Sequence, residues 1–168
     1  MSVLASDIKF YLSGGASNSD VNASLGGAKS STAITDDTLN NLWDDVSGDE
    51  HTAGDTEYRC LFVKNDSAET AYNVKLWIDT NTTSAEDTFN IGLDLTGVGD
   101  TADTVGDEST APDPAVTFSA AANQGAALSL GNMTTKQSYP IWIKRIVTAG
   151  STPQAANEAI LKVYVDTL

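Results

Sequence analysis

The sequence predicts an all-β domain, and two observations carry this prediction. Short apolar segments rich in β-branched and aromatic residues alternate with segments of Gly, Ser, Thr, Asn and Asp, as is typical of strands joined by polar loops. The chain has 168 residues, enough for one buried core but little more. We therefore expect a single domain, 1–168, folded as a two-sheet antiparallel β-sandwich, immunoglobulin-like or jelly-roll-like, with one short helix and long polar loops.

The segment Glu57–Asn65 is the most apolar part of the chain and is predicted to be its central strand. Both of its alternating faces are largely apolar, as expected of a strand that packs on two sides. Ala71–Asp79 and Ser138–Ile146 share its mixture of apolar and basic residues, so we expect all three segments in one sheet. The alternation in Ala71–Asp79 places Trp77 on the solvent side, exposed or under a loop.

Shorter alternating segments predict the remaining strands. These are Asp7–Leu12, Phe89–Leu95, Val116–Phe118, Leu128–Leu130 and Ala159–Asp166. Ala16–Ser31 and Gly97–Pro114 are polar and rich in small residues, so both are expected to be long surface loops. Residues 1–31 are thus expected to form a strand followed by an extended N-terminal loop arm.

One segment has helical spacing. Leu39, Leu42, Trp43 and Val46 stand at i, i+3, i+4 and i+7, which places them on one face of a helix. We therefore expect a short helix over Thr35–Val46, capped at Thr35 and stopped by Gly48.

The chain is strongly acidic, with 9 basic and 23 acidic residues and a net charge of −14. Such a surface repels phosphate backbones and anionic membranes, so neither nucleic acid nor a membrane is an expected partner. The N-terminus lacks the pattern of a signal peptide, and no stretch of about eighteen apolar residues is present. We expect synthesis in the cytoplasm.

No residue pattern predicts catalysis or a cofactor. His51 is the only histidine and lies in an acidic segment without a nucleophile motif, so we do not expect an enzyme. The lone cysteine, Cys60, lies in the most apolar strand and is interpreted as core. The carboxylates of Asp100–Asp113 could gather around calcium, but they lack EF-hand spacing, and a solvated loop is the preferred interpretation.

Three parts of the sequence resemble small structural proteins of tailed bacteriophages. They are Ser6–Asn18 followed by Ala23–Gly27, the segment Glu57–Asn65, and Ile141–Arg145 followed by Ala149 and Gly150. The resemblance covers most of the chain outside Gly97–Ala122. It implies a non-enzymatic β-sandwich on the virion, in the first place a capsid decoration (cement) protein, made in the host cytoplasm. Its implied partners are the major capsid protein and other copies of the chain, for which a trimer is one arrangement.

Two alternatives stay open. The first is a structural protein of the tail, baseplate or neck, and the second is a carbohydrate-binding surface module whose tryptophans stack on sugars. We expect the contact surface in Ser2–Ser31, which is long and uncharged in its middle. The candidate contacts with the capsid or another partner are Phe10, Tyr11, Leu25, Trp43, Trp77 and Trp142.

Overall fold

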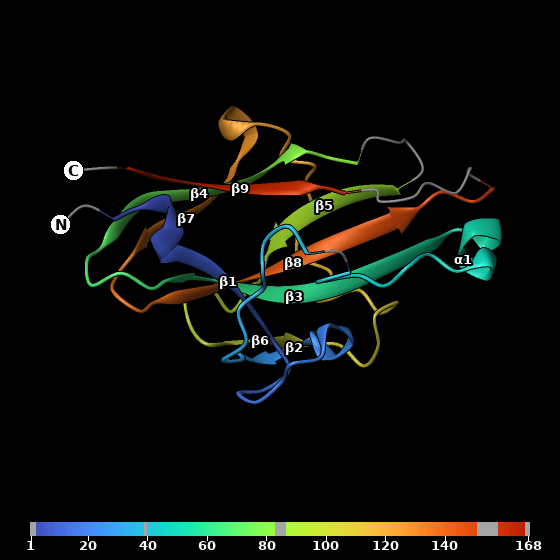
Figure 1. Cartoon of the computed structure of the whole chain (residues 1–168), viewed down its shortest axis with the longest axis horizontal. Helices are drawn as coiled ribbons and strands as arrows, with labels where there is room; N and C mark the ends of the chain where they lie inside the picture. The colour runs from blue at the N-terminus through green and yellow to red at the C-terminus, as the bar shows by residue number, and fades with distance from the viewer. Residues whose placement is uncertain (1–2, 39, 83–86, 151–157, 167–168) are drawn as a thin grey trace.

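The computed structural model describes residues 3–38, 40–82, 87–150 and 158–166 of the chain (Figure 1). Nine strands and one α-helix are assigned in these ranges: β1 (Ile8–Leu12), β2 (Gly26–Ala28), α1 (Gly48–Ala53), β3 (Asp55–Asn65), β4 (Ala71–Thr80), β5 (Asp87–Leu93), β6 (Thr101–Thr104), β7 (Leu128–Met133), β8 (Ser138–Val147) and β9 (Ile160–Asp166). Short 3₁₀ turns lie at Ala5–Asp7, Val21–Ala23 and Gln124–Ala126.

The strands form antiparallel sheets in three layers, which confirms the all-β, sandwich-like prediction (Figure 1). The middle sheet has the order β1-β3-β8-β5, and the sheet β7-β4-β9 packs on one of its faces. A small sheet, β2-β6, lies on the other face. The two-sheet sandwich is therefore extended by a third, thinner layer.

The central strand is β3, as predicted. It pairs with β8 from Asp55↔Val147 to Lys64↔Ser138 and with β1 along its second half. Leu61 and Val63 point into the core shared with β7-β4-β9, whereas Cys60 and Phe62 point into a second core under β2-β6. Cys60 is fully buried, and its burial raises the pKa of the thiol well above the ordinary value. Its interpretation as a core residue is confirmed.

The expectation that β4 shares a sheet with β3 and β8 is wrong, because β4 pairs with β7 and β9. The change of sheet occurs at Asn65, which is completely buried. Its side-chain amide donates to the carbonyl oxygens of Glu69 and Met133 at 2.8 and 2.9 Å. These bonds turn the chain out of the middle sheet, and strand composition alone does not encode that turn.

The predicted helix over Thr35–Val46 is also wrong. Asp37 and Asn40 have left-handed backbone conformations, with φ of 52° and 55°, and the Asn41 side chain donates to the carbonyl of Thr35 at 2.6 Å. Leu39 lies outside the described residues. Polar side chains thus bind the local backbone in place of helical hydrogen bonds.

The α-helix begins after this segment instead, at Gly48, which was expected to stop one. Ser47 is the N-cap and forms a capping box with Glu50: the Ser47 hydroxyl accepts from the Glu50 amide, and the Glu50 carboxylate accepts from the Ser47 amide. This reciprocal pair satisfies free amides at the helix start. The apolar spacing upstream offers no such cap.

The two segments predicted as long loops pair with each other. Ala16–Ser31 contains β2, Gly97–Pro114 contains β6, and Gly26 lies opposite Thr104. Gly26 has a φ of +93°, and a Cβ there would lie 1.7 Å from the carbonyl oxygen of Asp103, so only glycine fits. The N-terminal segment is therefore a packed layer and not an extended arm.

One of the predicted strands is absent. Val116–Phe118 has no strand assignment, and the adjacent Ser119 forms only an isolated bridge with Ile91. Val116 nevertheless fills the core under β2-β6. Its apolar character reflects this burial and not participation in a sheet ladder.

Candidate functional site

The candidate partner-binding surface is the N-terminal layer, which we define as residues 13–35. Two buried serines fix it to the middle sheet. Ser24 forms two hydrogen bonds with the backbone of Cys60 in β3. The Ser24 carbonyl accepts from the Cys60 amide at 2.8 Å, and the Ser24 hydroxyl donates to the Cys60 carbonyl at 2.7 Å. The Ser24 hydroxyl also accepts from the amide of Ser13, whose hydroxyl accepts from the amide of Gly26, both at 2.9 Å.

Asn18 holds the outer part of the same layer together. Its side-chain amide donates to the carbonyls of Ser13 and Asp20 at 2.6 and 2.9 Å. Its own carbonyl accepts from the hydroxyls of Ser30 and Thr32 at 2.5 and 2.7 Å. The two limbs of the layer are thus linked by side-chain hydrogen bonds, which substitute for a regular strand ladder.

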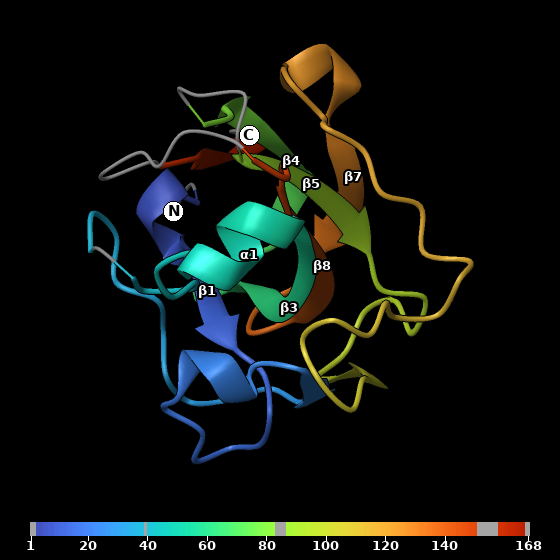
Figure 2. The same cartoon turned by 90° about the vertical axis from the view of Figure 1, so that its right-hand side faces the viewer.

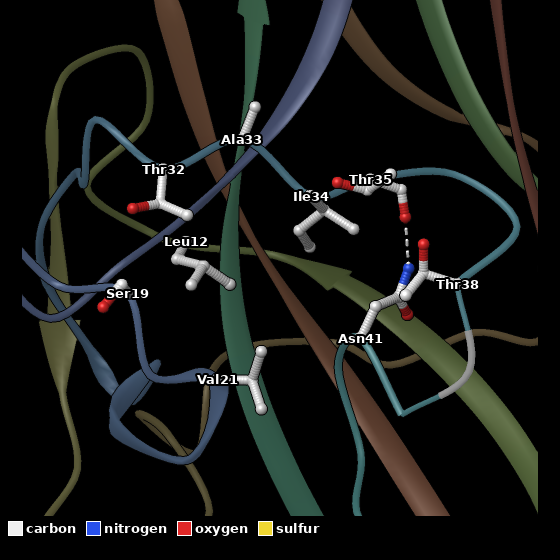
Figure 3. A pocket seen from close by; sticks show the side chains of 9 residues that line it. All are labelled: Leu12, Ser19, Val21, Thr32, Ala33, Ile34, Thr35, Thr38 and Asn41. Atoms are coloured by element: carbon white, nitrogen blue, oxygen red, sulfur yellow. Dashed lines mark hydrogen bonds between the residues drawn. The ribbon is translucent and has the colours of Figure 1, made fainter.

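A hollow of about 170 Å³ opens in this layer (Figure 3). Its lining carries no charged side chain and comprises Leu12, Ser19, Val21, Thr32, Ala33, Ile34, Thr35, Thr38 and Asn41. Figure 3 shows Thr35, Thr38 and Asn41 together on one side of the hollow, where Asn41 donates to the Thr35 carbonyl. Aliphatic side chains and hydroxyl groups therefore meet at one uncharged surface.

The N-terminal layer differs sharply in charge from the rest of the protein. Between Phe10 and Thr35 only Asp20 and Lys29 are charged, whereas the whole chain has a net charge of −14. A partner that covers this layer need displace little water from charged groups, which is the costly part of forming a polar interface.

A second, acidic hollow of about 380 Å³ lies beside the N-terminal layer. It is lined by Asn22, Leu25, Asp44, Gly106, Asp107 and Glu108. The fully buried Arg59 donates to the Asn22 side chain at 3.0 Å and pairs with Glu108. Arg59 thereby ties the N-terminal layer to the loop that follows β6.

Trp43 lies between two buried arginines. The guanidinium carbons of Arg59 and Arg145 lie 4.9 and 5.0 Å from its ring, and its ring centroid lies 6.0 Å from that of Phe89. Arg145 also pairs with Glu57 and donates to the carbonyl of Asp44 at 2.9 Å. Trp43 thus holds its irregular segment onto the sandwich and is not simply presented to a partner.

The other predicted contact residues divide into two groups. Phe10, Tyr11 and Leu25 are half-buried in or beside the N-terminal layer. Trp77 is 9% exposed and Trp142 is completely buried, with its indole donating to Asp94 at 2.7 Å. Of the two positions predicted for Trp77, exposed or under a loop, the exposed one is therefore wrong, and neither tryptophan lies on the protein surface.

Sequence reasoning did not identify the residues that shape this surface. Ser13, Asn18 and Ser24 follow no apolar periodicity, and their partners lie on other segments. The available signal was the absence of charge in a long segment, which singled out the region but not its hydrogen bonds.

Three carboxylates of the acidic segment Asp100–Asp113 have separate partners. Asp107 accepts from the hydroxyls of Ser109 and Thr110 at 2.8 Å each, Asp113 accepts from the amide of Ala115, and Glu108 pairs with Arg59. Each of these three carboxylates thus binds a different group.

Comparison with protein-family models, with curated proteins and with solved structures found no match to this chain. In the part of the chain that the structure describes, no helix has the length and apolar character needed to cross a bilayer.

Proposed function

We propose that this protein is a non-enzymatic structural component of a tailed-bacteriophage particle, and specifically a decoration protein that binds the shell of major capsid protein. The observation that supports the proposal is the internally hydrogen-bonded N-terminal layer, with only Asp20 and Lys29 charged, on an otherwise strongly acidic sandwich. A fixed surface loses little conformational entropy on docking, and one with few charges loses little hydration.

The remaining surface suits exposure on a particle. A net charge of −14 keeps copies of the chain soluble and apart, and it repels nucleic acid. Contacts between neighbouring copies then rest on the same N-terminal layer or on its borders. The carbohydrate-binding alternative has lost its support, because Trp77 and Trp142, on which it depended, are buried.

Copy number tests the location on the particle. Quantitative mass spectrometry of purified particles should find this chain in an amount comparable to the major capsid protein. A few dozen copies or fewer would contradict a head decoration and would favour the tail, baseplate or neck.

A pair of matched substitutions tests the surface. Removal of Ser2–Leu25 would delete β1, with its buried Ile8 and Leu12, so a point substitution is the better probe. Ser19→Glu places a carboxylate at an exposed position in the lining of the uncharged hollow. Ser129→Glu makes the same change at an exposed position of β7, opposite Lys75.

We expect Ser19→Glu to weaken binding to shells that lack the protein by about tenfold or more, because an unpaired charge must be dehydrated on docking. Ser129→Glu should leave binding within about twofold of the native protein. Equal binding by both variants would refute the assignment of the N-terminal layer as the docking surface.

A further inference from the structure

The helix α1 covers one end of the sandwich (Figure 2). Three carboxylates converge there. Glu50 belongs to α1, and Asp55 and Glu57 stand two residues apart on β3, so their side chains share one face of that strand. One oxygen from each residue lies within 4.8 Å of the other two. Gly54 ends the helix between them, and its amide donates to the carbonyl of Glu50 at 2.7 Å.

In each of these carboxylates a separate donor already binds one oxygen. Oε2 of Glu50 accepts from the amide of Ser47 at 2.6 Å, and Oδ1 of Asp55 accepts from the amide of Thr56 at 2.7 Å. Oε2 of Glu57 pairs with Nε of Arg145. These bonds fix the orientation of all three groups and use one oxygen of each.

Glu57 provides a second, independent observation at this cluster. Its side chain is 1% exposed, and its Oε1 has no hydrogen-bond partner. Buried acceptors without a partner are rare, because the lost contact with water is not replaced. Burial also raises the pKa of Glu57, while its pairing with Arg145 opposes that rise.

The local charge balance favours a cation. The cluster has one direct cationic partner, Arg145, which also lies 3.4 Å from a carboxylate oxygen of Asp44. The charges of Arg59 and Glu108 also act on Glu57, with opposite sign. Like charges this close repel one another in a partly dehydrated setting. Arg145 and Arg59 together therefore leave an excess of negative charge beside the carboxylates at this end of the sandwich.

We propose that Glu50, Asp55 and Glu57 bind a calcium ion, with one oxygen each as ligand and water completing the shell. Oxygen-only ligands suit a hard cation, and calcium accepts several carboxylates in a flexible geometry. Magnesium usually keeps several waters and binds one or two carboxylates, so a set of three carboxylates favours calcium. The ion would join α1 to β3 and give Glu57 Oε1 its missing partner.

Calorimetric titration of calcium chloride into the full chain, after treatment with EDTA, tests the site. We expect one ion per chain. Glu50 is a partly exposed residue of α1. Glu50→Gln should weaken calcium binding by about tenfold or more, since a charged ligand is lost. Asp49→Asn is the matched control, because it makes the same charge change on the neighbouring exposed residue and should alter binding by less than about twofold.

Thermal unfolding provides the second measurement. At a free calcium concentration about ten times the dissociation constant, the Tm should rise by about 3 to 5 °C, and Glu57→Gln should abolish the rise. Measuring both glutamine variants in EDTA separates loss of binding from loss of folding.

No heat of binding at millimolar calcium, or equal weakening by Asp49→Asn and Glu50→Gln, would overturn the proposal. The site concerns the isolated chain, so this result is independent of capsid docking.

Discussion

Replacing Trp43 by alanine should destabilise the protein by about 2 to 4 kcal/mol. The indole lies against the guanidinium groups of Arg59 and Arg145, at 4.9 and 5.0 Å, and both arginines are at least 96% buried. A dehydrated cation over an aromatic ring is worth about 1 to 2 kcal/mol, and loss of the half-buried indole from its contact with Phe89 adds a packing term.

Two further variants separate these contributions. Trp43→Leu keeps apolar volume but removes the ring face, and Trp43→Phe keeps a weaker ring. The expected order of destabilisation is Ala, then Leu, then Phe, measured by urea unfolding followed by far-ultraviolet circular dichroism with an unchanged m value. The explanation fails if the Trp43→Leu variant is as stable as the Trp43→Phe variant. It also fails if Trp43→Ala lowers the free energy of unfolding by less than about 1 kcal/mol.

Two other predictions concern stability. Phe62→Ala should lower the free energy of unfolding by about 3 to 5 kcal/mol in urea unfolding, since Phe62 is fully buried. Tyr72→Ala, at an exposed position of β4, should lower it by less than about 1 kcal/mol. Similar losses in both variants would contradict the second core under β2-β6. Burial and a 2.5 Å hydrogen bond to Asp66 raise the pKa of Tyr11 from 10.0 to about 12. The neutral phenol is favoured in the folded state, so this contribution is complete below pH 10 and lost as the pH rises to 12. The urea midpoint should fall over that range, and Tyr11→Phe should reduce the fall; an identical pH profile would refute the coupling.

The strands β3, β4, β5, β8 and β9 were predictable because period-two alternation of apolar residues directly reflects burial of one or both strand faces. The same property explains the error at Val116. Alternation reports burial, and Val116 is buried in the core under β2-β6 without belonging to a strand.

The helix shows how local competition defeats periodicity. The spacing of Leu42, Trp43 and Val46 fits a helix, but Asn41 binds the backbone of Thr35 and the effective cap is Ser47 with Glu50. A capping box satisfies backbone amides that apolar spacing cannot. The capping motif was visible in the sequence and indicated the true start of the helix.

The sequence by itself determined the all-β class, the central strand with its core cysteine, and an N-terminal segment with few charges in an acidic chain, since each follows from residue type along the chain. Only the tertiary structure decided which strands share a sheet, that β2 and β6 pair, and that Glu50, Asp55 and Glu57 converge. These features join residues through turns such as that at Asn65, whose side chain bonds to the carbonyl of Met133 far along the chain. Local propensity carries no information about such a partner.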